Sequence, residues 1–116
     1  MSNKLGVFTI PTGFTGSLSV LDLGFPAASV IARGAAASVT AHYCLGVASG
    51  PTGDGKTRCH EHRVSGGDSK VVATHFFLSF PGLRVDFSGS VADGFVLNVV
   101  TNTVGSDVEV LYYAFS

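Results

Sequence analysis

The chain has 116 residues, of which 46% are hydrophobic and only 13% are charged, and its formal net charge is −1. The charged fraction is about half that of an average soluble domain. The near-zero net charge argues against the electrostatic surface with which proteins bind nucleic acid or anionic membranes. A chain so poor in charge must expose much uncharged surface or cover part of it with neighbours. Assembly with other protein subunits is therefore the first expectation.

Nothing in the chain predicts a membrane span or a secretory signal. No apolar run reaches the roughly 18 residues that a membrane helix needs. The first residues, MSNKLGVFTIPTG, contain a short apolar run that Pro11 interrupts, and they lack the small-residue cleavage site of a signal peptide. We therefore expect synthesis in the cytoplasm and no membrane partner.

Strand-forming residues dominate the chain, and Gly, Pro, Ser and Asp divide them into short segments. The pattern predicts strands over residues 5–10, 17–23, 28–33, 39–48, 57–65, 70–80, 83–88, 94–101 and 107–115. Segments such as SLSVLDL, LRVDFSG and DVEVLYY alternate in polarity, which is typical of strands with one buried and one wet face. THFFLSF (74–80) is apolar on both faces, which indicates a central strand or a subunit contact.

No segment has a convincing helical period, and no linker or tandem repeat divides the chain. Regular short strands separated by turns are typical of an antiparallel sandwich or barrel. We predict an all-β fold: one single-domain antiparallel β-sandwich over residues 1–116, jelly-roll-like, with about eight or nine short strands. The longest polar loop is GVASGPTGDGK (46–56), a hairpin tip that can reach a partner.

Cys44 and Cys59 are the only cysteines. A hairpin centred between Pro51 and Thr52 would set them directly opposite, so a cross-strand disulfide is geometrically possible if the Cα atoms lie within about 7 Å. A reducing cytoplasm favours thiols instead, and oxidation after release from the cell would reconcile the two. A disulfide, buried thiols, and an intermolecular bond or metal ligation all stay open at this point.

Several histidines near the cysteines raise the question of a metal site. The complete set is His42, Cys44, Cys59, His60, Glu61, His62 and His75. Tetrahedral zinc is conceivable with two thiolates and one imidazole, but the spacing matches no zinc motif. We expect no metal and no cofactor, and we interpret RCHEHR (58–63) as an ordinary strand whose charges pair across the hairpin. Its imidazoles would make a contact there respond to mild acid.

Catalytic motifs are missing from the sequence. Ser, His and Asp occur, but no nucleophile elbow places them, and GPTGDGK lacks the spacing and the following helix of a P-loop. The acidic residues are scattered over turns and wet strand faces. We therefore expect no enzyme activity and no catalytic residues.

The segment VADGFVLNVVTN (91–102) predicts a corner followed by a core strand. Asp93 can accept backbone N–H groups in an Asx-type turn, and Gly94 can take a positive φ angle. Phe95 then returns to the core, with alternating residues after it.

Longer segments carry a resemblance to a known family. GVFTIPTGFTGSLSVLDLGFPAASVIA holds a Gly-x-Phe-Thr strand, a Thr-Gly turn and the corner Gly24-Phe25-Pro26. AHYCLGVASG ends in a Gly-containing bend, and DGFVLNVVTNTVGSDVEVLYYAF joins Asp-Gly-Phe, a Leu-Asn strand and a closing Tyr-x-Ala-Phe strand. In this order they resemble the small β-sandwich modules of tailed-bacteriophage virion proteins. An aromatic residue usually follows Leu-Asn in that family, where this chain has Val99.

The resemblance implies a structural virion protein that is made in the host cytoplasm. We expect a capsid decoration (cement) protein that binds the major capsid protein as a homo-oligomer, with a trimer favoured. The alternative is a tail protein, a fibre module that binds a receptor or a carbohydrate by stacking Tyr43, Tyr112 or Tyr113 on sugar. Partner contacts are expected in the segment Met1–Phe8, the 46–56 loop and the strand His60–Arg63. The candidate residues are Phe8, Thr52, Asp54, Lys56, His60, His62 and Arg63.

Overall fold

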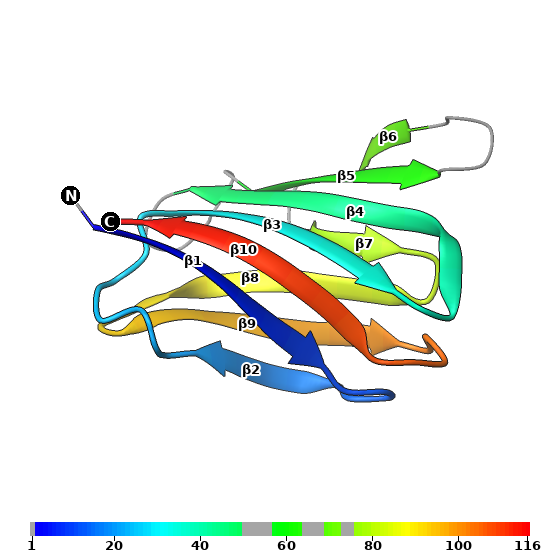
Figure 1. Ribbon diagram of the computed structural model, residues 1–116, viewed down its shortest axis with the longest axis horizontal. Coiled ribbons are helices and arrows are strands. Elements are labelled where there is room, and N and C mark those ends of the chain that lie inside the picture. The colour runs from blue at the N-terminus through cyan, green and yellow to red at the C-terminus, as the bar shows by residue number, and fades with distance from the viewer. Residues whose placement is uncertain (1, 50–56, 64–68, 73–75) are drawn as a thin grey trace.

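A computed structural model describes residues 2–49, 57–63, 69–72 and 76–116 (Figure 1). Within them the secondary structure is entirely β. The strands are β1 (Asn3–Ile10), β2 (Gly16–Val20), β3 (Ser29–Ala36), β4 (Val39–Ser49), β5 (Thr57–Arg63), β6 (Ser69–Val72), β7 (Phe76–Phe80), β8 (Leu83–Val91), β9 (Gly94–Asn102) and β10 (Val108–Phe115). The prediction of an all-β antiparallel sandwich is confirmed, with ten strands in the described parts of the chain.

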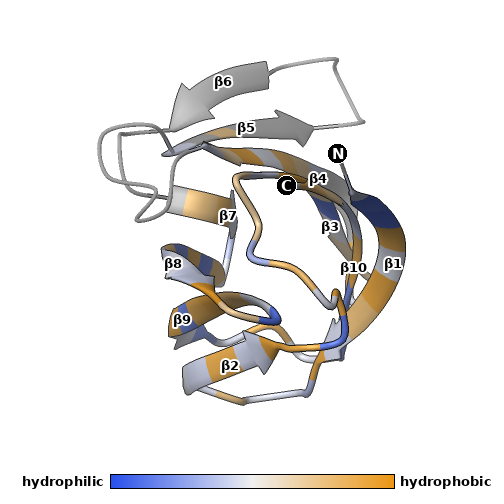
Figure 2. Cartoon of the chain, turned by 90° about the vertical axis from the view of Figure 1, so that its left-hand side faces the viewer, coloured by the Kyte–Doolittle hydropathy of each residue, from blue (hydrophilic) through white to orange (hydrophobic). Residues whose placement is uncertain are grey.

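The strands form two antiparallel sheets that pack face to face. The six-stranded sheet has the order β1-β10-β3-β4-β5-β6, and the four-stranded sheet has the order β2-β9-β8-β7. Figure 2 shows the larger sheet curving over the smaller one. At one edge the winding is jelly-roll-like, because β1 pairs with β10 in one sheet while β2 pairs with β9 in the other.

The two ends of the chain therefore lie side by side (Figure 1). The N–H of Ser116 donates to the carbonyl of Ser2 at 2.9 Å, and the N–H of Ser2 donates to the hydroxyl of Ser116 at 2.8 Å. Pairing along the whole of β1 and β10 brings together residues about a hundred positions apart.

The predicted strand at 70–80 is wrong as a single element. It divides into β6, in the six-stranded sheet, and β7, at the edge of the four-stranded sheet. Phe77 and Leu78 are adjacent in sequence, yet both are fully buried. The pairing of β7 with β8 shifts register between Phe76 and Leu78, and such a bulge turns consecutive side chains toward the same side. The apolar run thus reflects a bulged edge strand beneath β4 and β5, not a central strand.

Aromatic rings join the two sheets at the centre of the core. The ring of Phe95, from β9, lies 5.5 Å from Tyr112, 5.9 Å from Phe87 and 6.5 Å from Phe8, measured between centroids. Phe77 meets Phe87 at 5.4 Å. Phe87 and Phe95 are stacked, and the other three pairs are edge-to-face. Pairs of both kinds add about 0.5–1.5 kcal/mol each beyond the area that they bury.

The corner before β9 is explained by close packing and not by a positive φ angle. Gly94 is absent from the glycines with positive φ, so the predicted reason for a glycine there is wrong. A Cβ atom on Gly94 would collide with the carbonyl group of Val20. The neighbouring carbonyls of Asp93 and Gly94 accept hydrogen bonds from the N–H groups of Leu23 and Ala27, at 3.0 and 3.4 Å. The corner thereby fastens the β2–β3 connection to the four-stranded sheet.

We expect Gly94→Ala to lower the free energy of unfolding by about 2–3 kcal/mol, because the added methyl group overpacks a backbone contact that cannot move aside. Urea unfolding followed by circular dichroism measures the change. Gly105→Ala is the matched control: its Cβ would meet only ordinary contacts at 3.8 Å, so its effect should stay within about 0.5 kcal/mol. Equal effects from the two substitutions would contradict the packing explanation.

Candidate interaction surface

The outer face of the six-stranded sheet carries an unusual number of exposed aliphatic side chains. Their exposed fractions run from 39% to 63%. We call this set the apolar belt, and its members are Leu5, Val7, Ile31, Leu45, Val47 and Leu111.

Strand register assembles the belt from four neighbouring strands. On an antiparallel sheet, residues that are register partners stand side by side on the same face. The first row runs Leu5, Tyr113, Ile31, Val47, and the second runs Val7, Leu111, Arg33, Leu45, each from β1 through β10 and β3 to β4. A shallow depression lined by members of both rows lies across these four strands. The belt is therefore one continuous surface.

The outer face of the four-stranded sheet provides an internal comparison. One of its rows is Ser17, Asn98 and Asp86, and Arg84 on the same face forms an ion pair with Asp86 at 3.1 Å. Such polarity is the rule for an antiparallel sheet with one face on the core. In these rows, the two outer faces of the molecule thus differ in chemistry.

Two opposite charges border the belt. Arg33 stands in the second row on β3, and its guanidinium lies 4.6 Å above the ring of Tyr43. Glu109 is exposed on β10, in register with Ala35, and lines one depression together with Arg33 and Leu111. Glu109 therefore gives the half of the belt on β1 and β10 a negative border. Arg33 gives the half on β3 and β4 a positive side chain.

The cysteines face the core and are not joined by a disulfide. The expected direct opposition does not occur: Cys44 is in register with Glu61, and Cys59 with Gly46. The two thiols are diagonal neighbours on the inner face, with exposed fractions of 0% and 1%. The Cys44 thiol donates to the carbonyl of Gly34 at 3.8 Å, and the Cys59 thiol donates to that of Ser79 at 3.8 Å. The pKa of the Cys44 thiol is raised well above its ordinary range. The larger cause is a hydrogen bond with Cys59, and the second is burial.

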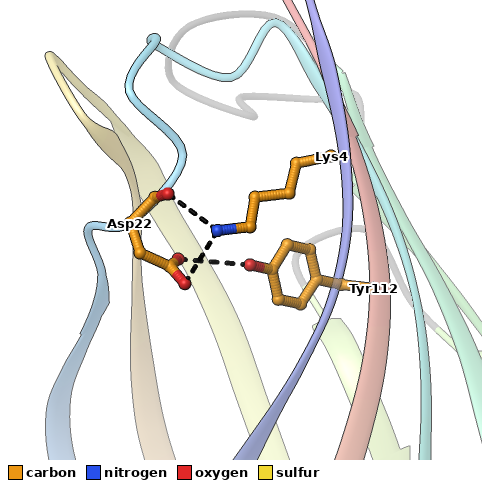
Figure 3. Close-up of polar contacts among 3 residues, drawn as sticks. All are labelled: Lys4, Asp22 and Tyr112. Carbon is orange, nitrogen blue, oxygen red and sulfur yellow. Dashed lines mark hydrogen bonds and ion pairs between the residues drawn. The ribbon is translucent and has the colours of Figure 1, made fainter.

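A polar cluster closes the sandwich beside the edge strand β1. Figure 3 shows Lys4 and Tyr112 both directed at Asp22, which follows β2. The Lys4 ammonium donates to the Asp22 carboxylate at 3.0 Å and to the Asp22 carbonyl at 2.8 Å. The Tyr112 hydroxyl donates to the same carboxylate at 3.3 Å. Gly6 leaves room for this arrangement, because a Cβ there would collide with the Tyr112 ring.

The cluster shifts two pKa values in opposite directions. The hydrogen bond from Lys4 lowers the pKa of Asp22, which outweighs partial desolvation. Burial raises the pKa of Tyr112, and the neighbouring Asp22 carboxylate adds to that effect. Both shifts favour the charge states present near neutral pH, so the cluster is a structural contact and offers no proton donor or acceptor poised for catalysis.

The residues expected to touch partners have mixed positions. Phe8 packs against the core beside Phe95 and Tyr112, so it does not belong to an outer surface. On β5, His60 is in register with Leu45, His62 with Tyr43 and Arg63 with His42. Thr52, Asp54 and Lys56 lie outside the described residues.

The three tyrosines expected to stack on sugar have different surroundings. Tyr112 is 2% exposed, inside the core. Tyr43 lies beneath Arg33, and Tyr113 packs on Phe115 with ring centroids 4.6 Å apart. In residues 2–49, 57–63, 69–72 and 76–116, no group of three or more His, Cys, Asp or Glu is arranged to hold a metal ion. No helix in those same ranges is long and apolar enough to cross a membrane.

Comparison with known proteins adds no relative: no protein-family model matches the chain, and no curated protein matches it.

The sequence already contained a signal for the belt. In DVEVLYY the outward positions after Glu109 are Leu111 and Tyr113, which are not polar. In YCLGV, the outward Tyr43, Leu45 and Val47 alternate with small inward residues. The polar residues Asp107 and Glu109 come first on that face of the strand, and the apolar residues that continue onto neighbouring strands come after them.

We expect both thiols of the native protein to react at least ~100-fold more slowly with a thiol reagent than an exposed cysteine, because burial suppresses the thiolate. Ser19→Cys, on the polar outer face, supplies the exposed reference. In denaturant both native thiols should react fully. Fast reaction of one native thiol in buffer would contradict the inward orientation.

We expect Lys4→Gln to return the pKa of Asp22 toward its ordinary value near 4. Because the folded pKa is lowered, the stability that Asp22 contributes is present above the unfolded pKa and is lost as pH falls through the folded one. The difference in unfolding free energy between wild type and variant should therefore be constant near neutrality and shrink below about pH 4.

Carboxyl-carbon NMR titration measures this pKa directly. Asp107 is the internal control, because its pKa is lowered by the hydroxyl and the N–H of Thr12 and not by a cation. An unchanged Asp22 pKa in the variant would show that Lys4 is not the cause.

Proposed function

We propose that this chain is a structural, non-enzymatic subunit that acts by assembling with other protein subunits. The supporting observation is the apolar belt, six exposed aliphatic side chains in two registered rows on one outer face. Soluble monomers rarely expose contiguous apolar patches larger than a few hundred Å², and larger ones mark interaction sites. The row of Ser17, Asn98 and Asp86 on the four-stranded sheet is polar, so exposed aliphatic side chains are not a general property of the outer faces of this molecule.

The type of assembly is proposed from the resemblance to β-sandwich modules of tailed-bacteriophage virions. We assign the chain to the outside of the capsid as a decoration protein that binds the major capsid protein. Binding only to the assembled shell stabilises that shell by mass action. Many repeated weak contacts around the particle then combine through avidity.

A tail-fibre module is the second candidate function, and it too would be part of the virion. Carbohydrate binding by the tyrosines has less support, because Tyr112 is buried and Tyr43 is stacked under Arg33. Copy number separates the two roles, since a coat is abundant and a fibre tip is scarce.

We expect the chain to occur in purified particles at a copy number close to that of the major shell protein, as measured by quantitative mass spectrometry. Its removal should lower the temperature at which the shells release their genome, and adding back the purified protein should restore it. A few copies per particle would move the assignment to the tail. Absence from particles would overturn the virion assignment.

A further inference from the structure

We infer that residues 2–22 form an arch that opens as one unit while the rest of the sandwich stays folded. The arch consists of β1, the turn that follows it, β2 and the two residues after β2. Its opening is a property of the single chain, so it goes beyond the proposed function and does not depend on it. Topology, burial and hydrogen bonding each support it.

The arch occupies one edge of each sheet (Figure 1). β1 is an edge strand of the six-stranded sheet and pairs with β10, and β2 is an edge strand of the four-stranded sheet and pairs with β9. Loss of both strands would break these two pairings and leave the orders β10-β3-β4-β5-β6 and β9-β8-β7 intact. The arch can therefore leave without dividing either sheet.

Little of the hydrophobic core comes from the arch. Ile10 and Val20 are the only residues between positions 2 and 22 that are buried. Phe8, Phe14 and Leu18 are partly buried and pack against the core from outside. Regions with few buried apolar contacts open at a lower free energy than core strands do. The burial pattern therefore favours opening of the arch ahead of the rest of the molecule.

The two faces of β1 explain why its side chains hold it weakly. Leu5 and Val7 point away from the core and are each 63% exposed. Lys4 and Gly6 occupy neighbouring inward positions, so half of the inward side of this strand is not apolar. Strand register is strongly specified only where an apolar face is buried. Backbone hydrogen bonds to β10 therefore carry much of the attachment of β1.

The aromatic core does not need the arch. Phe95 contacts Tyr112 and Phe87, and Phe87 contacts Phe77, all from strands outside the arch. From the arch, Phe8 adds one ring to this cluster. The ring contacts that join the two sheets therefore persist when the arch is open.

Two contacts within the arch make it one unit. In the turn between the strands, the N–H of Phe14 donates to the carbonyl of Pro11 at 3.0 Å. At the opposite end, Lys4 near the start of β1 donates to the carboxylate of Asp22 just beyond β2, at 3.0 Å (Figure 3). β1 and β2 are thus joined to each other at both ends, so that release of one strand favours release of the other.

Side chains outside the arch hold its turn. The amide group of Asn102 donates to the carbonyls of Pro11 and Phe14, both at 3.1 Å. The carboxylate of Asp107 accepts hydrogen bonds from the N–H and the hydroxyl of Thr12, both at 2.8 Å. Both donors and acceptors belong to the turn and not to the strands, so these contacts secure β1 and β2 together.

The other end of the arch has a fixed point just beyond it. The N–H of Leu23 donates to the carbonyl of Asp93 at 3.0 Å, which fastens the chain to the four-stranded sheet. Within the arch, Ser2 exchanges two hydrogen bonds with Ser116. The hinge of the opening therefore lies between Asp22 and Leu23.

Opening of the arch changes two surfaces at once. It removes Leu5 and Val7, which are two of the six residues of the apolar belt. It also uncovers the edges of β9 and β10, and unpaired edges are places where another extended segment can add. The arch is thus a cover over both sheet edges and a part of the belt.

Native-state hydrogen exchange followed by NMR tests the arch. The informative amides of β1 and β2 are those that donate to β10 and β9, because the other amides of an edge strand face water. We expect them to exchange at least ~30-fold faster than the paired amides of β3 and β4. Low concentrations of urea should change their rates little, because opening of the arch exposes less surface than global unfolding.

Asp107→Ala distinguishes the opening of a unit from the fraying of single strands. It removes the hydrogen bonds to Thr12 in the turn, so exchange should accelerate at least ~3-fold along both β1 and β2. Asp86→Ala is the matched control, because Asp86 also accepts two hydrogen bonds, from Arg84, but lies on β8. It should leave the exchange of β1 and β2 unchanged. Urea unfolding confirms that both variants fold.

Equal protection of the arch and of β3 and β4 in the wild-type chain would overturn the inference. Acceleration by Asp107→Ala that is confined to amides beside Thr12 would also overturn it, because the two strands would then open separately.

Discussion

The structure depends on the position of β10 between β1 and β3 in the six-stranded sheet. Its alternation sends Val108, Val110, Tyr112 and Ala114 into the core and leaves Glu109 and Leu111 outside. A slip of one residue would exchange these two sets and expose Tyr112. Burial of the inner set fixes the register, and the register in turn builds the belt on the opposite side. The core and the apolar belt are therefore two results of one strand pairing.

The exposed aliphatic side chains gather on part of the larger sheet. Across β1, β10, β3 and β4 the two rows of the belt consist of Leu, Val, Ile and Tyr with one Arg, Arg33. On the smaller sheet the row of Ser17, Asn98 and Asp86 is polar, and Asp86 forms an ion pair with Arg84. Charge is not missing from the larger sheet as a whole, because β5 and β6 contain Arg58, Glu61, Arg63 and Lys70. The grouping of the apolar residues on four neighbouring strands is therefore more informative than the low charge content of the chain.

Much of the fold was predictable because strand periodicity and turn residues are local signals. Eight of the nine predicted strands correspond to one observed strand each, with ends within a few residues. The segment 70–80 failed because its continuous apolar run comes from two strands in different sheets and a bulge at Phe77. The belt escaped prediction because it exists only across four strands, and no single segment contains it. The cysteine offset and the clash behind Gly94 depend on register and on contact between sheets, which are equally nonlocal.

The pairing of β1 with β10 has a consequence for when the belt is complete. Half of the belt lies on β1 and β10, and β10 follows β1, β3 and β4 in the sequence. During translation, β1 has no sheet to join and the exposed row is interrupted at its centre. A nascent chain without β10 consequently has no completed belt. Pairing of distant residues delays folding, and here that delay also postpones the formation of a continuous apolar surface until β1 and β10 have paired.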